Sequence, residues 1–389
     1  MTTTDQTAPP AASATGGATT TTDWVARAEA LAPELDRRAA EHDRTGELVT
    51  PSLALLRAEG FLGAPVPADL GGGGATHAEV CAVLRTLGRA CGSTAVTLSM
   101  HYHLTGTQVW RHRHGQPAEA ILRRVAAEDL FLVSTGASDW VGSNGTARAV
   151  DGGFRVSARK APASGAAFGD ILVTSIRWDD APDGPTVLHC SVPFAAEGVS
   201  VERTWDTVGL RGTGSDTVVL DDVFVPEAAV SLQRPADRWH PVWNTVLGTA
   251  LPLILSAYVG IADRAVEEAL AVARQRLDRP GIESAVGVML DHRAAAEDAV
   301  AAMIARADDL WFPNTDDVGA FALTRKAAAA RAVEATTRAA LDVAGGLGYS
   351  RGVIERCHRD ALGARYHPLP ETAQVAFTGR VALGLDPVG

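Results

Sequence analysis

Apolar residues are spaced in two different ways along this chain. In the C-terminal part, residues 237 to 384, they recur three and four positions apart, which predicts helices over 252–276, 285–312 and 318–344. These segments are rich in alanine and contain few helix breakers, as is typical of helices in an antiparallel bundle. Residues 22 to about 127 are also predicted to be helical, from their start and stop residues.

The helix boundaries in the N-terminal part are set by capping residues. Asp23 is a typical helix cap and Gly46 a typical stop, so a first helix is expected between them. Thr76 is expected to open a later helix, and Ser93 a further one that runs to about Arg113.

The middle of the chain, from residue 130 to about 230, follows a different pattern. Short runs of β-branched residues alternate with turn residues, and Asp151-Gly152-Gly153 separates two such runs. Asp-Gly between alternating runs is a hairpin signal. Several short strands at this spacing predict a β-sandwich or a β-barrel.

These patterns together predict an α+β fold with three domains. A disordered tail is expected over 1–21, where Thr, Ala, Pro and Gly dominate and the basic start and apolar core of a secretory signal are missing. An N-terminal helical domain is expected over 22–128, a middle β-domain over 129–232 and a C-terminal helical bundle over 233–389.

Composition narrows the range of functions. The formal net charge of -11 argues against a nucleic-acid partner, which would need a basic stripe. No apolar run is expected to reach the ~20 residues of a membrane span. The four cysteines form no C-x-x-C pair and are interpreted as reduced core residues, so a cytoplasmic location is expected. No cluster of metal ligands stands out, and no metal is predicted.

One C-terminal stretch carries a recognisable motif. Gly345-Gly346-Leu-Gly-Tyr349 is followed by Glu355-Arg356, then by Arg359-Asp360, and then by a loop that leads into the last helix. This order resembles the C-terminal signature of the acyl-CoA dehydrogenase superfamily. The resemblance extends from about residue 24 to the end of the chain. It implies a flavoenzyme with a helical domain, a β-domain and a four-helix bundle, assembled as a homotetramer.

The resemblance also implies which residues bind the flavin. Ser134 and Thr135 lie in the stretch that contacts the flavin ring, and Ser164 falls where a hydroxyl approaches flavin N5. Other residues are expected to hold the phosphates or the rest of the cofactor: Asp342, Gly345, Gly346, Thr372, Gln374, and either Arg276 or Arg279. The expected cofactor is FAD, with FMN supplied in reduced form as the alternative.

The usual catalytic base of this superfamily is missing from the sequence. A dehydrogenase needs a carboxylate within reach of the substrate's α-carbon. The two family positions for it fall on Pro370 and Ala250, and neither residue is acidic. Glu371 stands one residue too late, which rotates a helical side chain by ~100°. It can be a displaced base, or it can be an acidic residue favoured by the helix start.

The expected site carries imidazole and hydroxyl groups instead. His101 and His103 lie on the helix that should line the flavin pocket, His367 precedes the last helix, and Ser164 completes the set. This resembles the flavin-dependent monooxygenase branch of the superfamily, which oxygenates thiophenes, phenols or amines. Such side chains can hydrogen-bond oxygen carried by a flavin and exchange a proton near neutral pH. His101 and His103 are two residues apart, so both cannot reach one atom from the same helix.

Three functions remain open at this point. The first is a two-component monooxygenase that uses oxygen and reduced flavin from a separate reductase, acting on a small organic or carrier-bound substrate. The second is an acyl-CoA or acyl-carrier dehydrogenase with Glu371 as its base and an external electron-transfer partner. The third is a non-catalytic flavin- or acyl-binding protein.

Overall fold

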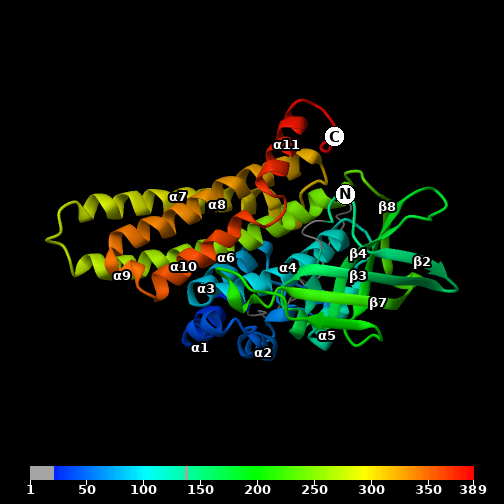
Figure 1. The fold of residues 1–389 in the computed structure, drawn as a ribbon, viewed down its shortest axis with the longest axis horizontal. Helices are drawn as coiled ribbons and strands as arrows, with labels where there is room; N and C mark the ends of the chain where they lie inside the picture. Colours follow the sequence, from blue (N-terminus) through cyan, green and yellow to red (C-terminus); the bar gives the residue numbers. More distant parts are fainter. Residues whose placement is uncertain (1–21, 136–138) are drawn as a thin grey trace, which may run out of the picture.

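The computed structural model describes residues 22–135 and 139–389, so the tail expected over 1–21 lies outside the described residues. Two sheets lie at one end of a bundle of long helices (Figure 1). The predicted α+β fold, with helices on both sides of the β-part in sequence, is confirmed. The α-helices are α1 Trp24–Thr45, α2 Thr50–Ala58, α3 His77–Ala90, α4 Gly92–Arg113, α5 Glu119–Glu128, α6 Val242–Arg274, α7 Ile282–Ala307, α8 Asp316–Ala344, α9 Gly346–Tyr349, α10 Val353–Ala361 and α11 Glu371–Ala382. The strands are β1 Leu132–Ser134, β2 Thr146–Val150, β3 Gly153–Ala163, β4 Ile171–Trp178, β5 Thr186–Pro193, β6 Val199–Glu202, β7 Asp216–Pro226 and β8 Val230–Pro235.

Capping residues fix the N-terminal helices where the sequence predicts them. The Asp23 carboxylate accepts a hydrogen bond from the Ala26 backbone N–H at 2.9 Å, and Gly46 ends α1 with a left-handed φ of 67°. At the start of α3, Thr76 and Glu79 form a reciprocal capping box. Both predicted starts are confirmed, and α4 begins one residue before the predicted Ser93.

The β-part contains two four-stranded sheets, ordered β1-β4-β5-β8 and β2-β3-β7-β6. The Asp151-Gly152 turn joins β2 to β3 as an antiparallel hairpin in which Val150 pairs with Gly153, which confirms the predicted hairpin. β1 pairs with β4 in parallel and brings Ser134 beside Val173. The flavin motif expected after β1 therefore begins at a fixed strand end, although Gly136, Ala137 and Ser138 lie outside the described residues.

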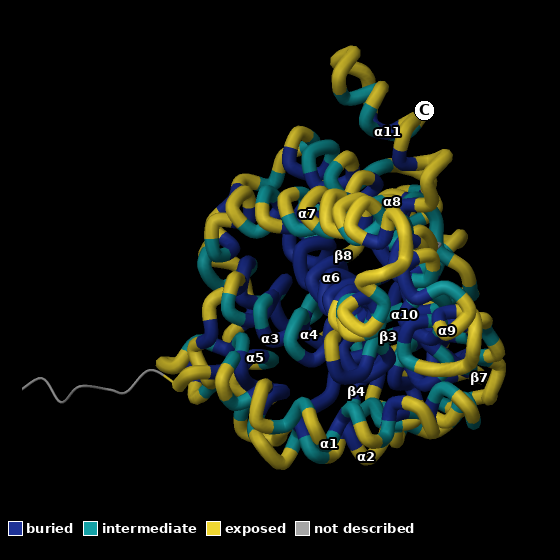
Figure 2. The backbone as a smooth tube through the Cα atoms, turned by 90° about the vertical axis from the view of Figure 1, so that its left-hand side faces the viewer, coloured by how far each residue is buried: buried dark blue, intermediate teal, exposed yellow. Residues whose placement is uncertain are grey.

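Helix α6 runs through the middle of the bundle, and most of its residues are buried (Figure 2). The apolar spacing of the sequence predicts that this helix starts at Pro252. That prediction is wrong: α6 begins ten residues earlier, at Val242, and Pro252 lies inside it. The expectation that no apolar run reaches the length of a membrane span is also wrong. Part of α6 is long and apolar enough, but 94% of that part is buried inside the protein.

Close helix crossing explains how α6 is held. A Cβ on Gly88 of α3 would lie 2.3 Å from the backbone oxygen of Ala257, and one on Gly260 would lie 2.1 Å from the backbone oxygen of Arg85. Only glycine allows the two backbones to approach so closely. The crossing fixes the rotation of α6 and therefore the direction of the side chains between the two contacts.

The last part of the chain departs from the bundle. α7 ends at Ala307 rather than at the predicted 312, because Asp308 and Asp309 both have a left-handed φ of 44°. After α10 a short 3₁₀ turn over Leu362–Arg365 leads into a loop, and α11 then projects away from the body of the molecule (Figures 1 and 2). The loop between Arg365 and α11 passes over the end of the cavity described next.

Candidate active site

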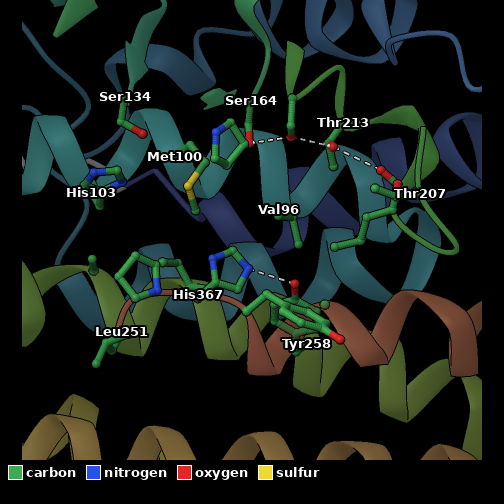
Figure 3. A pocket seen from close by; sticks show the side chains of 18 of the residues that line it. Val96, Met100, His103, Ser134, Ser164, Thr207, Thr213, Leu251, Tyr258 and His367 are labelled. Carbon is green, nitrogen blue, oxygen red and sulfur yellow. Dashed lines mark hydrogen bonds between the residues drawn. The ribbon is translucent and has the colours of Figure 1, made fainter. Parts of the chain in front are cut away.

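A cavity of about 600 Å³ lies where α4, α6, the β-part and the loop after α10 meet. This volume is in the range of pockets that hold cofactors and small organic ligands. Most of its wall is apolar and aromatic, including Met100, Trp140, Trp205, Trp243, Leu251 and Ile254. The polar groups enter from opposite walls: His103, Ser134 and Ser164 on one side, His367 and Tyr258 on the other (Figure 3).

Hydroxyl groups from the β-part form one wall. Ser164 Oγ lies 2.8 Å from Ser215 Oγ, which lies 2.8 Å from Thr213 Oγ1, so three hydroxyls form a hydrogen-bonded chain. Thr135 is linked to Thr174 at 2.6 Å, and Ser134 faces the cavity beside it. The predicted residues Ser134, Thr135 and Ser164 are therefore brought together, although their contact with a flavin stays a prediction.

Lys160 on β3, four residues before Ser164, has a structural role. Lys160 Nζ forms a buried ion pair with Asp139 at 2.8 Å and also donates to Ser143 Oγ and to the Asn144 backbone oxygen. Removing one partner of a buried pair leaves an uncompensated charge, which is strongly destabilising. The pair therefore ties the segment 139–144 to the end of β3 that precedes Ser164.

The two neighbouring histidines of α4 lie in different environments. His103 lines the cavity, and burial lowers its pKa to about 4. His101 is fully buried outside the cavity: its Nε2 lies 3.0 Å from the Leu62 backbone oxygen, and its Nδ1 accepts from the Leu132 N–H at 3.0 Å. Both ring nitrogens of His101 are occupied by backbone groups. It ties α4 to β1 and does not contact the cavity, so only His103 is placed for the proposed proton chemistry.

His367 reaches the cavity from the opposite wall. Its Nε2 lies 2.8 Å from the hydroxyl of Tyr258 on α6. Burial, followed by the nearby Lys326 ammonium and His103, lowers the pKa of His367 to about 3. The imidazole is therefore uncharged at neutral pH. Burial also raises the pKa of Tyr258 well above its ordinary value, so the phenol keeps its proton.

None of the three candidate positions supplies a carboxylate to the cavity. Ala250 lines it, but Pro370 does not. Glu371 opens α11 and points to solvent, where its Oε1 accepts a hydrogen bond from Arg331 at 2.8 Å with both side chains about half exposed. Among the described residues of the cavity wall, none is acidic. This arrangement matches the helix-start interpretation of Glu371.

The residues expected to hold the rest of the cofactor lie elsewhere on this chain. Arg276 and Arg279 donate to the backbone oxygens of Ala344 and Val343, at 3.1 Å each, and so cap the end of α8. Asp342 is exposed on the same helix end.

The remaining expected contacts are also separate from the cavity wall. Gly345 has a left-handed φ of 60° beside the two arginines, and Gly346 follows it at the start of α9. Thr372 is exposed on α11, whereas Gln374 is buried. The flavin-binding role of these residues stays a prediction.

Two cavity-related residues escaped sequence analysis. Tyr258 gave no signal, because it is one of many buried residues on an apolar helix. Lys326 did give one: it falls on the apolar stripe of α8, three residues after Leu323 and four before Ala330, where a lysine is normally absent. It is 2% exposed and donates to two backbone oxygens of the loop that carries His367.

The wall of the cavity fits a flavin. A ring system needs apolar and aromatic faces plus a few polar partners, and this wall offers both aromatic residues and hydroxyls. The Nε1 of Trp243 is buried without a hydrogen-bond partner among the described residues. A buried donor without a partner is costly and is expected to meet a ligand or a water molecule.

Comparison with known proteins agrees with this geometry. The acyl-CoA dehydrogenase N-terminal domain matches residues 25–129, and the acyl-CoA dehydrogenase C-terminal domain matches residues 242–367. The chain is 30% identical to the amino sugar nitrososynthase DnmZ of Streptomyces peucetius over 92% of each chain. It is also 30% identical to the oxygenase subunit HsaA, a flavin-dependent monooxygenase of Rhodococcus jostii, over 61% of this chain and 62% of that protein.

A solved structure resembles the whole described fold. KijD3, in complex with FMN and dTDP-3-amino-2,3,6-trideoxy-4-keto-3-methyl-D-glucose, superimposes with a TM-score of 0.83 at 30% identity and 93% coverage of both chains. A match over this share of the chain includes both helical parts and the two sheets. The chain belongs to the acyl-CoA dehydrogenase superfamily and is a flavin-dependent oxidoreductase of its monooxygenase branch.

Proposed function

We propose that this chain is the oxygenase of a two-component monooxygenase. It takes a reduced flavin from a separate reductase, binds oxygen, transfers one oxygen atom to the substrate and releases the other as water. The reduced flavin supplies the two electrons and two protons that balance this reaction. The observation that carries the proposal is a cavity that offers uncharged imidazoles and hydroxyls, with no carboxylate among the described wall residues.

The same observation argues against a dehydrogenase. Removing an α-proton requires a carboxylate close to the substrate. Glu371 is turned to solvent and paired with Arg331, and the other two family positions are Pro370 and Ala250. For Glu371 to reach the cavity, the start of α11 would have to rotate and that ion pair would have to break.

The residues take separate roles in the proposed reaction. Ser134, Thr135 and Ser164 would contact the flavin ring, and Trp243 would offer its free N–H to a ligand. His103 and His367 would hydrogen-bond the reacting oxygen and guide proton movement, because both are uncharged and face the cavity from opposite walls. We propose FMN as the flavin, since KijD3 is in complex with FMN at this level of similarity.

We further propose that the substrate is compact and uncharged when bound. The one cation among the described wall residues is Arg359, and it is already occupied: it forms ion pairs with Asp43 and Glu355, both at 2.6 Å. A buried charge on the substrate would therefore lack a partner. A neutral amine or a small aromatic molecule fits this wall better than a nucleotide-linked sugar, although DnmZ is named for an amino sugar. A reductase partner, a homotetramer and a cytoplasmic location remain part of the proposal.

The decisive experiment is rapid mixing of the anaerobically reduced, FMN-loaded protein with oxygen, followed by flavin absorbance. An absorbance species distinct from both reduced and oxidised flavin, persisting for seconds, supports an oxygenase. Slow reoxidation without such a species, together with reduction of the bound flavin by acyl-CoA, would overturn the proposal in favour of a dehydrogenase. Free FMN mixed in the same way gives the background rate.

A further inference from the structure

The position of the proton on His367 follows from its contacts, and only its catalytic consequence rests on the proposed function. Tyr258 and His367 form the contact, with 2.8 Å between the Tyr258 hydroxyl and His367 Nε2. Tyr258 is 0% exposed. Gly363 leaves room for its hydroxyl, since a Cβ there would lie 2.6 Å from the Tyr258 oxygen. The hydroxyl is therefore held in one place beside the ring.

The direction of this hydrogen bond follows from counting donors and acceptors. Among the described residues, the Tyr258 hydroxyl has no other hydrogen-bond partner. If His367 donated from Nε2, the phenol proton would be buried without an acceptor, which costs about 1–3 kcal/mol. If Tyr258 donates instead, the phenol proton and the lone pair of Nε2 are paired with each other. The uncharged ring then carries its single proton on Nδ1.

The other ring nitrogen faces the cavity. Figure 3 shows His367 with one nitrogen bonded to Tyr258 and the other turned toward the space below Met100 and Ser164. An Nδ1–H in this position is a hydrogen-bond donor to whatever occupies the cavity. In the opposite tautomer the same nitrogen would be an acceptor and could act as a base.

Lys326 fixes the loop on which His367 stands. Its Nζ donates to the backbone oxygen of Arg365 at 3.2 Å and to that of Leu369 at 3.0 Å, so it binds the loop on both sides of His367. Lys326 approaches from α8, Tyr258 from α6 and His103 from α4. The ammonium of Lys326 and the ring of His103 both disfavour a second proton on His367.

We infer that Tyr258 and Lys326 are positioning residues that fix the proton of His367 on Nδ1 and hold this N–H toward the cavity. His367 then serves the reaction as a hydrogen-bond donor to the reacting oxygen. It does not start the reaction as a base. This assigns a function to a buried tyrosine and a buried lysine that belong to different helices and act through one imidazole.

The first test reads the tautomer directly and needs neither flavin nor activity. The full chain is labelled with ¹⁵N-histidine, and the nitrogen spectrum is recorded at neutral pH, where protonated and unprotonated ring nitrogens give separate signals. His367 is identified among the eleven histidines as the signal lost in His367→Gln. The expected result is a protonated Nδ1 and an unprotonated Nε2. A protonated Nε2 in the wild-type protein would overturn the inference.

Tyr258→Phe tests the role of the phenol. Without a donor at Nε2, the His367 signal should change to a mixture of tautomers or to Nε2–H. Tyr102→Phe is the matched control: Tyr102 is equally buried and donates to the Phe61 backbone oxygen, away from the cavity wall, so the His367 signal should not change. An unchanged tautomer in Tyr258→Phe would show that the phenol does not set it.

Two substitutions separate the charge of Lys326 from its hydrogen bonds. Lys326→Gln keeps a donor and removes the charge, so the pH at which His367 takes up a second proton should rise by about one unit while its signal stays sharp. Lys326→Met removes both, and the signal should also broaden as the loop loosens. The same signal width in both variants would contradict the role of the Lys326 hydrogen bonds in holding the loop. If these spectra match expectation but no absorbance species forms with oxygen, the proposed function fails and the tautomer assignment stands.

Discussion

The core around His101 and the cavity wall around His367 each hold an uncharged histidine, fully buried at His101 and partly buried at His367, yet they do different things. At His101 both ring nitrogens are bonded to backbone groups, Leu62 and Leu132, so the ring joins α4 to its neighbours. At His367 one nitrogen is bonded to a side chain and the other faces a cavity. Burial lowers both pKa values, to about 4 and about 3. A lowered pKa therefore does not identify a functional histidine; a nitrogen left available to a ligand does.

The largest expected effect is a loss of activity when the cavity-facing histidine is replaced. His367→Gln removes the donor proposed to face the reacting oxygen, so turnover should fall by ~10²–10³-fold. Oxygen consumption should continue while product formation is lost, because flavin can still be reoxidised. Product and hydrogen peroxide are measured side by side with reductase and reduced FMN supplied. If this variant still formed as much product per oxygen consumed as the wild-type protein, the role of His367 would be contradicted.

The next largest effect is a loss of stability when the core histidine, His101, is replaced. His101→Leu leaves the Leu62 oxygen and the Leu132 N–H without a partner in the core, which should lower the free energy of unfolding by about 2–4 kcal/mol. His103→Leu, two residues further along α4, is the control: it should change stability less and product formation more. Denaturant unfolding and turnover are measured for both variants. Equal stability losses would mean that the cavity-facing histidine is as structural as its neighbour.

A smaller effect per residue is expected on the free energy of unfolding when the pH is lowered. Burial lowers the pKa of His77 to about 4, as it does for His101, from an ordinary value of 6.5. The unfolded chain therefore binds protons that the folded protein does not. The free energy of unfolding should fall as the pH drops from about 6.5 toward 4, by up to ~1.4 kcal/mol per pH unit for each such histidine. In His101→Leu this slope should become shallower; an unchanged slope would contradict the assignment.

The smallest effect is expected at Glu371. Its ion pair with Arg331 is exposed on both sides, and such pairs contribute only about 0–1 kcal/mol. Glu371→Gln should therefore leave both turnover and stability nearly unchanged. Asp317→Asn, at the equally exposed start of α8, provides a comparison for the loss of one acidic side chain at a helix start. Complete loss of activity in Glu371→Gln alone would restore it as a displaced base.

Local signals in the sequence predicted much of the fold. The caps at Asp23 and Thr76 and the turn at Asp151-Gly152 satisfy backbone groups within a few residues, so they act the same way in any tertiary context. The start of α6 was mispredicted for the opposite reason. The helix continues upstream of Pro252 because most of residues 242–251 are buried against neighbouring elements.

Some residues of the candidate site could be predicted from the sequence, and others depended on tertiary contacts. The sequence named Ser164, His103 and His367, and the fold brings all three to one cavity from three parts of the chain. It also named His101, because spacing alone gives the angle between two helical side chains and not which of them faces a cavity. Tyr258 could not have been named, since its hydrogen bond joins positions 109 residues apart.

The sequence by itself determined the type and order of the elements, the loss of acidic residues at both base positions and the presence of a superfamily motif. These are properties of residue identity and short spacing. Only the tertiary structure decided that Glu371 faces solvent, that His101 is bonded to backbone on both nitrogens, and that Tyr258 and Lys326 converge on His367. These contacts depend on how the helices are rotated and packed against one another, and residues far apart in the chain fix that rotation together.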